Sequence, residues 1–116
     1  MTTADRHPRH GLDQVIHAPV RLSITATLSG VDRAEFGFVR DAVEITDSAL
    51  SKQVAVLEQA GYVTITKGYV GKRPRTWLAL SPAGRSAFER HLAALSEIAA
   101  RARDAVAADP GAVSPS

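Results

Sequence analysis

The segment TDSALSKQVAVLEQAGYV, from Thr46 to Val63, places hydroxyl, ammonium and amide groups along a helix that also carries an apolar stripe. When successive residues are rotated by about 100°, Ser48 and Lys52 lie opposite that stripe. Such polar groups hydrogen-bond phosphate oxygens and the base edges of the DNA major groove. Because any solvated helix face can have this composition, the segment alone leaves both interpretations open. The stripe consists of three residues: Leu50, Val54 and Leu57.

A second segment rich in functional side chains is KGYVGKRPR, from Lys67 to Arg75. It contains four cations and no acid. Its two glycines and its proline favour a tight turn at the tip. A basic hairpin that follows a helix–turn–helix can contact the phosphate backbone or the minor groove while a helix lies in the major groove. An ordinary charged hairpin end is the alternative, but the two segments together favour DNA binding.

Two helices are predicted ahead of these segments. Apolar residues at helical spacing predict a first helix over Leu12–Leu28, restarted at Pro19 and closed by Gly30. A capping box that begins at Asp32 predicts a second, short helix that ends near Val43. This pair supplies the apolar surfaces against which the stripe of the third helix can pack.

The remaining elements follow from caps and from alternation. Thr46 or Asp47 caps the third helix, and Gly61 lies at its left-handed end. Ser81 caps a long final helix, predicted over Pro82–Ala107. Alternating apolar residues predict two intervening strands, Tyr62–Thr66 and Thr76–Leu80.

Apolar residues of the final helix recur in four- and three-residue steps, as in a heptad seam: Phe88, Leu92, Leu95, Ala99, Ala102 and Val106. So long a helix extends beyond a small domain, and its alanines permit close helix approach. We therefore predict that it joins two copies of the chain; packing of the stripe on its own domain is the alternative. The predicted dimer interface comprises Leu12, Val15, Ile16, Phe88, Leu92, Leu95, Ala99 and Ala102.

Composition limits what else the chain can be. It has 116 residues, 45% of them hydrophobic, and a net charge of +2, which indicates one small globular domain. The absence of cysteine excludes disulfides, zinc knuckles and thiol-based sensing. No apolar run approaches the roughly 20 residues of a membrane span, and no signal-peptide core is visible. We therefore expect a cytoplasmic protein that does not interact with membranes.

The sequence predicts no enzyme, metal site or cofactor. It contains no Gly-rich phosphate loop, Ser–His–Asp order or paired acidic motif. The spacing of Tyr62, Tyr69 and Trp77 favours packing in the strands and hairpin over stacking on bases. Four histidines lack metal-ligand spacing: His7, His10, His17 and His91.

The stretch ITDSALSKQVAVLEQAGYVTITKGYVGKRPRTWLALSPAGRSAF resembles the winged helix-turn-helix transcriptional regulators of the MarR and ArsR kind. It is most similar to the short, single-domain MarR-like regulators, and the resemblance extends over about Leu12 to Ala100. It implies a homodimer that reads a pseudo-palindromic operator. By this resemblance the recognition helix carries Ser48, Ala49, Ser51, Lys52 and Gln53, and the wing carries Lys72, Arg73 and Arg75. We add Thr46 and Lys67 to the predicted DNA-contacting residues.

The predicted fold is mainly α (α+β): a winged helix-turn-helix with a two-stranded β wing and a long C-terminal dimerisation helix. We expect a sequence-specific regulator of double-stranded DNA, acting as a repressor, with no small-molecule effector identified. A winged-helix protein-interaction module and a non-specific architectural DNA-binding protein are the alternatives. The predicted parts are a flexible tail at 1–11, the winged helix at 12–81, the dimerisation helix at 82–108 and a second tail at 109–116.

Overall fold

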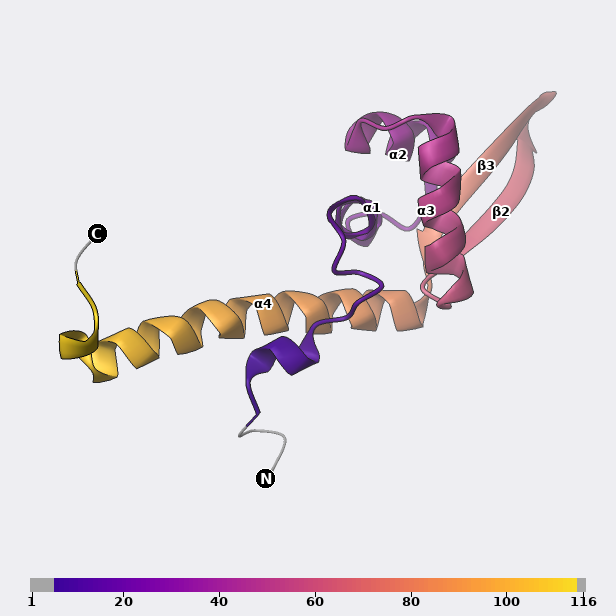
Figure 1. The fold of residues 1–116 in the computed structure, drawn as a ribbon. Helices are drawn as coiled ribbons and strands as arrows, with labels where there is room; N and C mark the ends of the chain where they lie inside the picture. Colours follow the sequence, from indigo (N-terminus) through magenta and orange to yellow (C-terminus); the bar gives the residue numbers. More distant parts are fainter. Residues whose placement is uncertain (1–5, 115–116) are drawn as a thin grey trace.

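The computed structural model describes residues 6–114 and has the predicted architecture, a mainly helical winged helix-turn-helix with a β-hairpin wing and a long C-terminal helix (Figure 1). Parts of both predicted tails, residues 1–5 and 115–116, lie outside the described residues. The elements in chain order are η2 (Pro8–Gly11), α1 (Pro19–Ser29), β1 (Ala34–Glu35), α2 (Phe36–Val43), α3 (Asp47–Gln59), β2 (Val63–Val70), β3 (Arg73–Leu80), α4 (Pro82–Ala108) and η3 (Pro110–Ala112).

The strands form one antiparallel sheet in the order β1-β3-β2. β2 and β3 pair over their full lengths and end with Val70 opposite Arg73, so the turn contains just Gly71 and Lys72. Gly71 has a φ of 63°, a left-handed conformation that glycine adopts without steric cost. Both strands are longer than predicted, because most of the basic segment is itself part of the ladder and not of a loop.

The short strand β1 was not predicted. The capping box at Asp32 indicated a helix from that point, but α2 begins at Phe36 because Ala34 and Glu35 pair with β3. Ala34 is buried opposite Leu78 and extends the sheet toward α2. The helix-turn-helix is thereby attached to the wing through backbone hydrogen bonds as well as through side chains.

The chain ahead of α1 also differs from its prediction. The first helix begins at Pro19, and the preceding residues form a turn in which the Asp13 carboxylate accepts hydrogen bonds from the N–H groups of Val15 and Ile16. Such local side-chain bonds compete with helix formation. Within the predicted flexible tail, Pro8–Gly11 forms the 3-10 helix η2, which packs against α4.

The main core lies between α1, α2, α3 and the inner face of the sheet. The predicted stripe of α3 is confirmed, since Leu50, Val54 and Leu57 are buried. A smaller cluster joins the start of α4 to the N-terminal segment through Ile16, Ala87 and Phe88. The full set in the main core is Ile24, Leu28, Ala34, Val39, Leu50, Val54, Leu57, Val63, Leu78 and Leu80.

Helix α4 is much longer than the domain that it leaves. Its 27 residues span about 40 Å at 1.5 Å per residue, and the molecule measures 68 Å along its longest axis. Its N-terminal half packs against α1 and η2, whereas every described residue from Arg101 onward is exposed. Figure 1 shows this distal part projecting away from the winged helix. None of the helices within residues 6–114 is long and apolar enough to cross a membrane.

Candidate nucleic-acid interface

The start of α3 presents the small polar surface that its sequence predicts. Ser48, Ser51 and Lys52 are exposed, and Ala49 is half-buried. The Thr46 hydroxyl accepts the N–H of Ala49 at 3.1 Å and so caps the helix, as predicted. The positive end of the helix dipole and the free N–H groups of the first turn favour an anion such as a phosphate at this place.

A charged cluster holds the turn between α2 and α3. The Arg40 guanidinium donates to the carboxylates of Asp41 at 2.8 Å and Asp47 at 2.9 Å. The hydrogen bond with Asp41 is the largest cause of a raised pKa at Arg40, and it lowers the pKa of the Asp41 carboxyl. Glu44, in the turn, has a left-handed φ of 61°. Arg40 therefore links the last turn of α2 to the first turn of α3.

Arg40 was not among the residues predicted to take part in DNA binding. The one signal that could have indicated its role is a cation near the end of a short helix with an acid, Asp47, at the start of the next helix. Because both acids already pair with it, Arg40 is less available to phosphates than a solvated arginine.

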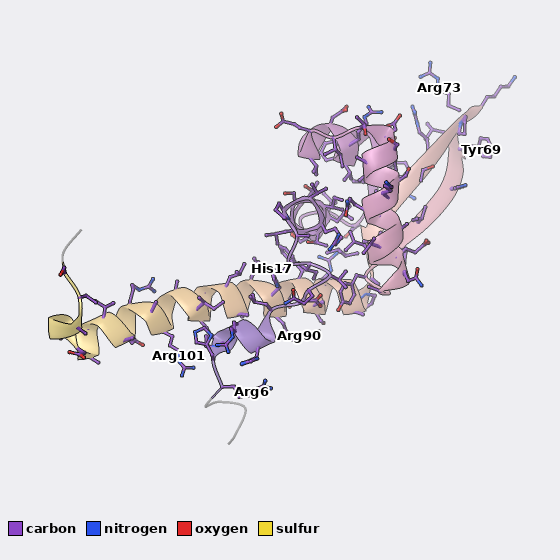
Figure 2. The ribbon with its side chains drawn as sticks, viewed as in Figure 1. Arg6, His17, Tyr69, Arg73, Arg90 and Arg101 are labelled. Carbon is purple, nitrogen blue, oxygen red and sulfur yellow. The ribbon has the colours of Figure 1, made fainter. Side chains whose placement is uncertain are left out.

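Strand register separates the predicted wing cations. Lys67 pairs with Thr76 on the face of the sheet toward α3, where both line a groove of about 340 Å³ together with Ser51 and Glu58. Lys72 occupies the exposed tip, and Figure 2 shows Arg73 at the outer end of the hairpin. Lys67 therefore faces α3, whereas Lys72 and Arg73 lie at the outer end of the hairpin.

Arg75 has a different environment from the other wing cations. It is half-buried on the outer face of the sheet, with its Nε atom 3.6 Å from a carboxylate oxygen of Glu35. That Nε atom is buried and has no hydrogen-bond partner among the described residues. Arg75 thus joins the base of the wing to β1, which makes it a less accessible phosphate ligand than Arg73.

The aromatic side chains divide into packed and exposed groups. Tyr62 is half-buried at the junction of the two cores, and Trp77 is half-buried with the Arg33 guanidinium 4.0 Å from its ring centroid. Tyr69, in contrast, is 76% exposed near the tip of the hairpin (Figure 2). The expectation that Tyr69 packs within the wing was therefore wrong, because Tyr69 lies in the outer part of the hairpin, which projects away from the helices (Figure 1).

Among the predicted recognition residues, Gln53 hydrogen-bonds to another helix of its own chain. It is half-buried at the edge of α3, and its Oε1 accepts a hydrogen bond of 2.9 Å from Nη1 of Arg21 on α1. The sequence analysis did not identify Arg21, which lies 32 residues earlier in the chain. One side of the Gln53 amide is consequently committed to the protein.

The residues of the predicted dimer interface fall into two groups. Ile16 and Phe88 are buried in the small core of their own protomer, and Val15 packs on the main core. Leu92 remains 45% exposed, and Leu95 is half-buried. Leu12 is half-buried, and Ala99 and Ala102 are exposed. A surface available to a second chain therefore begins at Leu92 and extends toward the C-terminus of α4.

An exposed polar helix start beside a basic hairpin, on a three-helix core, defines a DNA-binding winged helix protein. Residues 20–99 match the family described as winged helix DNA-binding domain, so the chain belongs to that family. The resemblance to regulators of the MarR and ArsR kind is confirmed, and the protein is a winged-helix DNA-binding transcriptional regulator.

Three similar proteins illustrate the relationship. An uncharacterised protein of Methanocaldococcus jannaschii is 28% identical over 79 residues, which cover 68% of this chain and 86% of that protein. A transcriptional regulator homologue from Pyrococcus horikoshii OT3 is 28% identical with a TM-score of 0.68, over 72% of this chain and 83% of its own. The transcriptional repressor BigR from Xylella fastidiosa is 25% identical with a TM-score of 0.57, over 80% and 92% of the two chains.

Proposed function

We propose that the protein is a repressor that binds as a homodimer to a pseudo-palindromic operator and blocks transcription by occupying it. The observation that carries the proposal is α4, a long helix on which the described part of the protomer leaves apolar residues from Leu92 onward partly or largely exposed. Leu92 is 45% exposed and Val106 is 49% exposed on this helix. Burial of such side chains against a second copy removes apolar surface from water, which favours association.

The shape of the exposed stripe fits a helix from a second protomer. The stripe that starts at Leu92 recurs every three or four residues along α4. It includes Ala99 and Ala102, whose small side chains are exposed. Small residues in a heptad-like stripe let two helix backbones approach closely. Phe88 belongs to the protomer core, so we place the start of the seam one turn later than the sequence suggested.

A two-fold dimer gives the DNA-reading surface its symmetry. Each protomer offers one α3 and one wing, so the operator must present two inverted half-sites. Successive major-groove entries on one face of B-DNA are separated by about 34 Å, or about one helical turn. A repressor role is supported by the similarity to BigR, a transcriptional repressor that is 25% identical to this chain.

Charge substitutions in the seam test this proposal. Leu92→Asp and Leu95→Asp place a carboxylate between the two helices, and both should yield monomers in analytical ultracentrifugation. Affinity for the operator should fall steeply, because the second half-site contact is no longer intramolecular. Ala93→Asp is the matched control, an exposed position on the same helix about 160° from Leu95 at 100° per residue. Monomers that retain full operator affinity, or dimers that survive both substitutions, would contradict the proposal.

The alternatives make different binding predictions. An architectural protein would bind duplex DNA in a salt-dependent way, but unrelated DNA would compete fully with the operator. A protein-interaction module would show no salt-dependent duplex binding at all. Competition titrations at two salt concentrations therefore separate the three functions.

A further inference from the structure

We propose that Arg21 sets which bases Gln53 can read, by engaging the amide oxygen of Gln53 and leaving the amide NH2 group for DNA. This inference rests on the proposed reading of an operator by α3. It assigns to α1, a helix behind the recognition helix, a direct part in sequence preference.

Two hydrogen bonds position the Arg21 guanidinium. Its Nη1 atom donates to Oε1 of Gln53 at 2.9 Å, and its Nε atom donates to the backbone carbonyl of Val15. Val15 is itself fixed, since its N–H donates to the Asp13 carboxylate at 2.9 Å. The position of the guanidinium is thus determined by the N-terminal turn and not by Gln53.

Elementary chemistry then fixes the direction of the amide. A guanidinium has five N–H donors and no acceptor, so the atom that faces it must be the amide oxygen. A 180° rotation of the Gln53 amide would bring an NH2 group against Arg21, with donors facing donors and a partly buried hydrogen bond lost. The nitrogen, on the opposite branch of the same carbon, therefore points away from Arg21 with its two hydrogens.

An amide held in this way reads a different base from a free one. A free glutamine contacts adenine through one donor and one acceptor, pairing with N6 and N7 in the major groove. With its oxygen turned toward Arg21, Gln53 presents its two N–H donors foremost, which match the two acceptors O6 and N7 of guanine. Only the second lone pair of the oxygen remains for the N6 donor of adenine. We therefore expect guanine, and not adenine, at the base pair that faces Gln53.

The test is selection of bound duplexes from a randomised pool by the full chain and by variants. Gln53→Ala first identifies the position that Gln53 reads, as the position where the preference is lost. Arg21→Met removes the donor while keeping an apolar stem, and adenine should gain at least about fivefold over guanine at that position, the lower end of what one bidentate contact discriminates. Arg85→Met is the control, because Arg85 donates to the Ser29 carbonyl at 3.0 Å, away from α3, and should leave every preference unchanged.

A second variant keeps the test decisive if Arg21→Met unfolds the protein. Gln53→Glu retains a partner for Arg21 but presents only acceptors, so cytosine, whose N4 is a donor, should be enriched at the same position. Circular dichroism of each variant reports whether the fold is intact.

The outcomes separate this inference from the proposed function. Selection of adenine by the unsubstituted protein, or an unchanged preference in Arg21→Met, overturns the inference. A uniform loss of affinity in Arg21→Met with the same base preference also overturns it, because Arg21 would then act on phosphates. If Gln53→Ala alters no position while an operator is still selected, Gln53 reads no base and the inference fails alone. Failure of every protein to select any sequence instead contradicts the proposed operator binding itself.

Discussion

Lys52 is the long cation on the exposed surface of α3, and we propose that its side chain discriminates between bases. Replacing it by Ala should cost on the order of 1–3 kcal/mol at a cognate site if it contacts a base. The loss on random DNA should be smaller, and Ser48→Ala and Ser51→Ala should be milder. Titration of each variant with cognate and random duplexes checks this; an equal loss on both would assign Lys52 to phosphate positioning.

Gly84 shows how one residue fixes the junction between wing and α4. A Cβ built on it would lie 2.0 Å from the carbonyl oxygen of Tyr62, a backbone atom that cannot move aside easily. Gly84→Ala should therefore destabilise the fold by about 1–3 kcal/mol, as overpacking does in a well-packed core. Gly68→Ala is the control, because nothing lies within 4 Å of its added Cβ. Denaturant unfolding measures both, and equal stability of the two variants would refute the tight contact.

The buried position of His91 leads us to expect that the stability of the fold depends on pH. It is fully buried, and its Nδ1 accepts the N–H of Asp13 at 3.1 Å, while its Nε2 lies 3.4 Å from Nδ1 of His17. Burial, followed by the nearby His17, lowers the pKa of His91 below its ordinary value of 6.5, against a smaller opposing effect of Asp13. Protonation would also remove the acceptor that Asp13 uses.

The direction of the pH dependence follows because proton binding is linked to unfolding. Just below pH 6.5 the unfolded chain binds a proton that folded His91 does not, so the stabilisation is present above that pH and is lost as the pH falls. Urea unfolding between about pH 5 and pH 8 should show this loss. The slope should flatten in His91→Gln, whose amide can still accept from Asp13. A stability that rises on acidification would contradict the assignment.

The exposure of a side chain could be predicted from the sequence where it depends on the rotation of a single helix. The exposed polar residues Ser48, Ser51 and Lys52 follow from the rotation of a helix about its own apolar stripe, which sequence spacing reports directly. Gln53 and Arg75 could not be placed in this way, because each is oriented by a partner on another element. Their partners, Arg21 and Glu35, have no fixed spacing relative to them.

At the scale of elements, the wing should supply affinity with little sequence information. Arg73 is exposed at the outer end of the hairpin, whereas Arg75 is paired with Glu35. Arg73→Ala should weaken binding to cognate and random DNA alike and should lower the salt slope by roughly one unit for one lost phosphate contact. Arg75→Ala should change that slope less. Titrations at several salt concentrations give the slope of log affinity against log salt concentration for each variant. An unchanged slope in Arg73→Ala would show that Arg73 makes no phosphate contact and would remove the wing from the interface.

The elements themselves could be predicted where local signals are strong. Thr46 and Ser81 cap the helices that were predicted from them, and Gly61 has the expected left-handed φ, here 80°. The strand β1 was missed because two residues carry no periodicity, and their pairing with β3 is a tertiary contact. The turn before Pro19 was read as helix because its apolar spacing persists while the Asp13 carboxylate holds the backbone in another conformation.

At the scale of the whole molecule, the winged helix reads DNA and the projecting α4 is proposed to set the distance between two copies of it. The protomer core already contains Phe88 and Ile16, whereas Leu92 and every described residue from Arg101 onward are exposed. Sequence spacing could not separate these two uses of one stripe, because a core contact and a dimer contact require the same apolar residues. The length of α4 relative to the domain supports the proposed dimer contact for its distal part.

Dimeric binding to an operator is tested most directly by a hydroxyl-radical footprint on the fragment that the protein retains from its own genomic DNA. A homodimer with one recognition helix per protomer should protect two inverted half-sites, with roughly 10 base pairs between their centres, on one face of the duplex. The same protection should disappear in Leu92→Asp at concentrations that saturate the unsubstituted protein. A single protected segment without inverted symmetry, or retention of unrelated fragments with equal affinity, would contradict the account of a dimeric, operator-specific regulator.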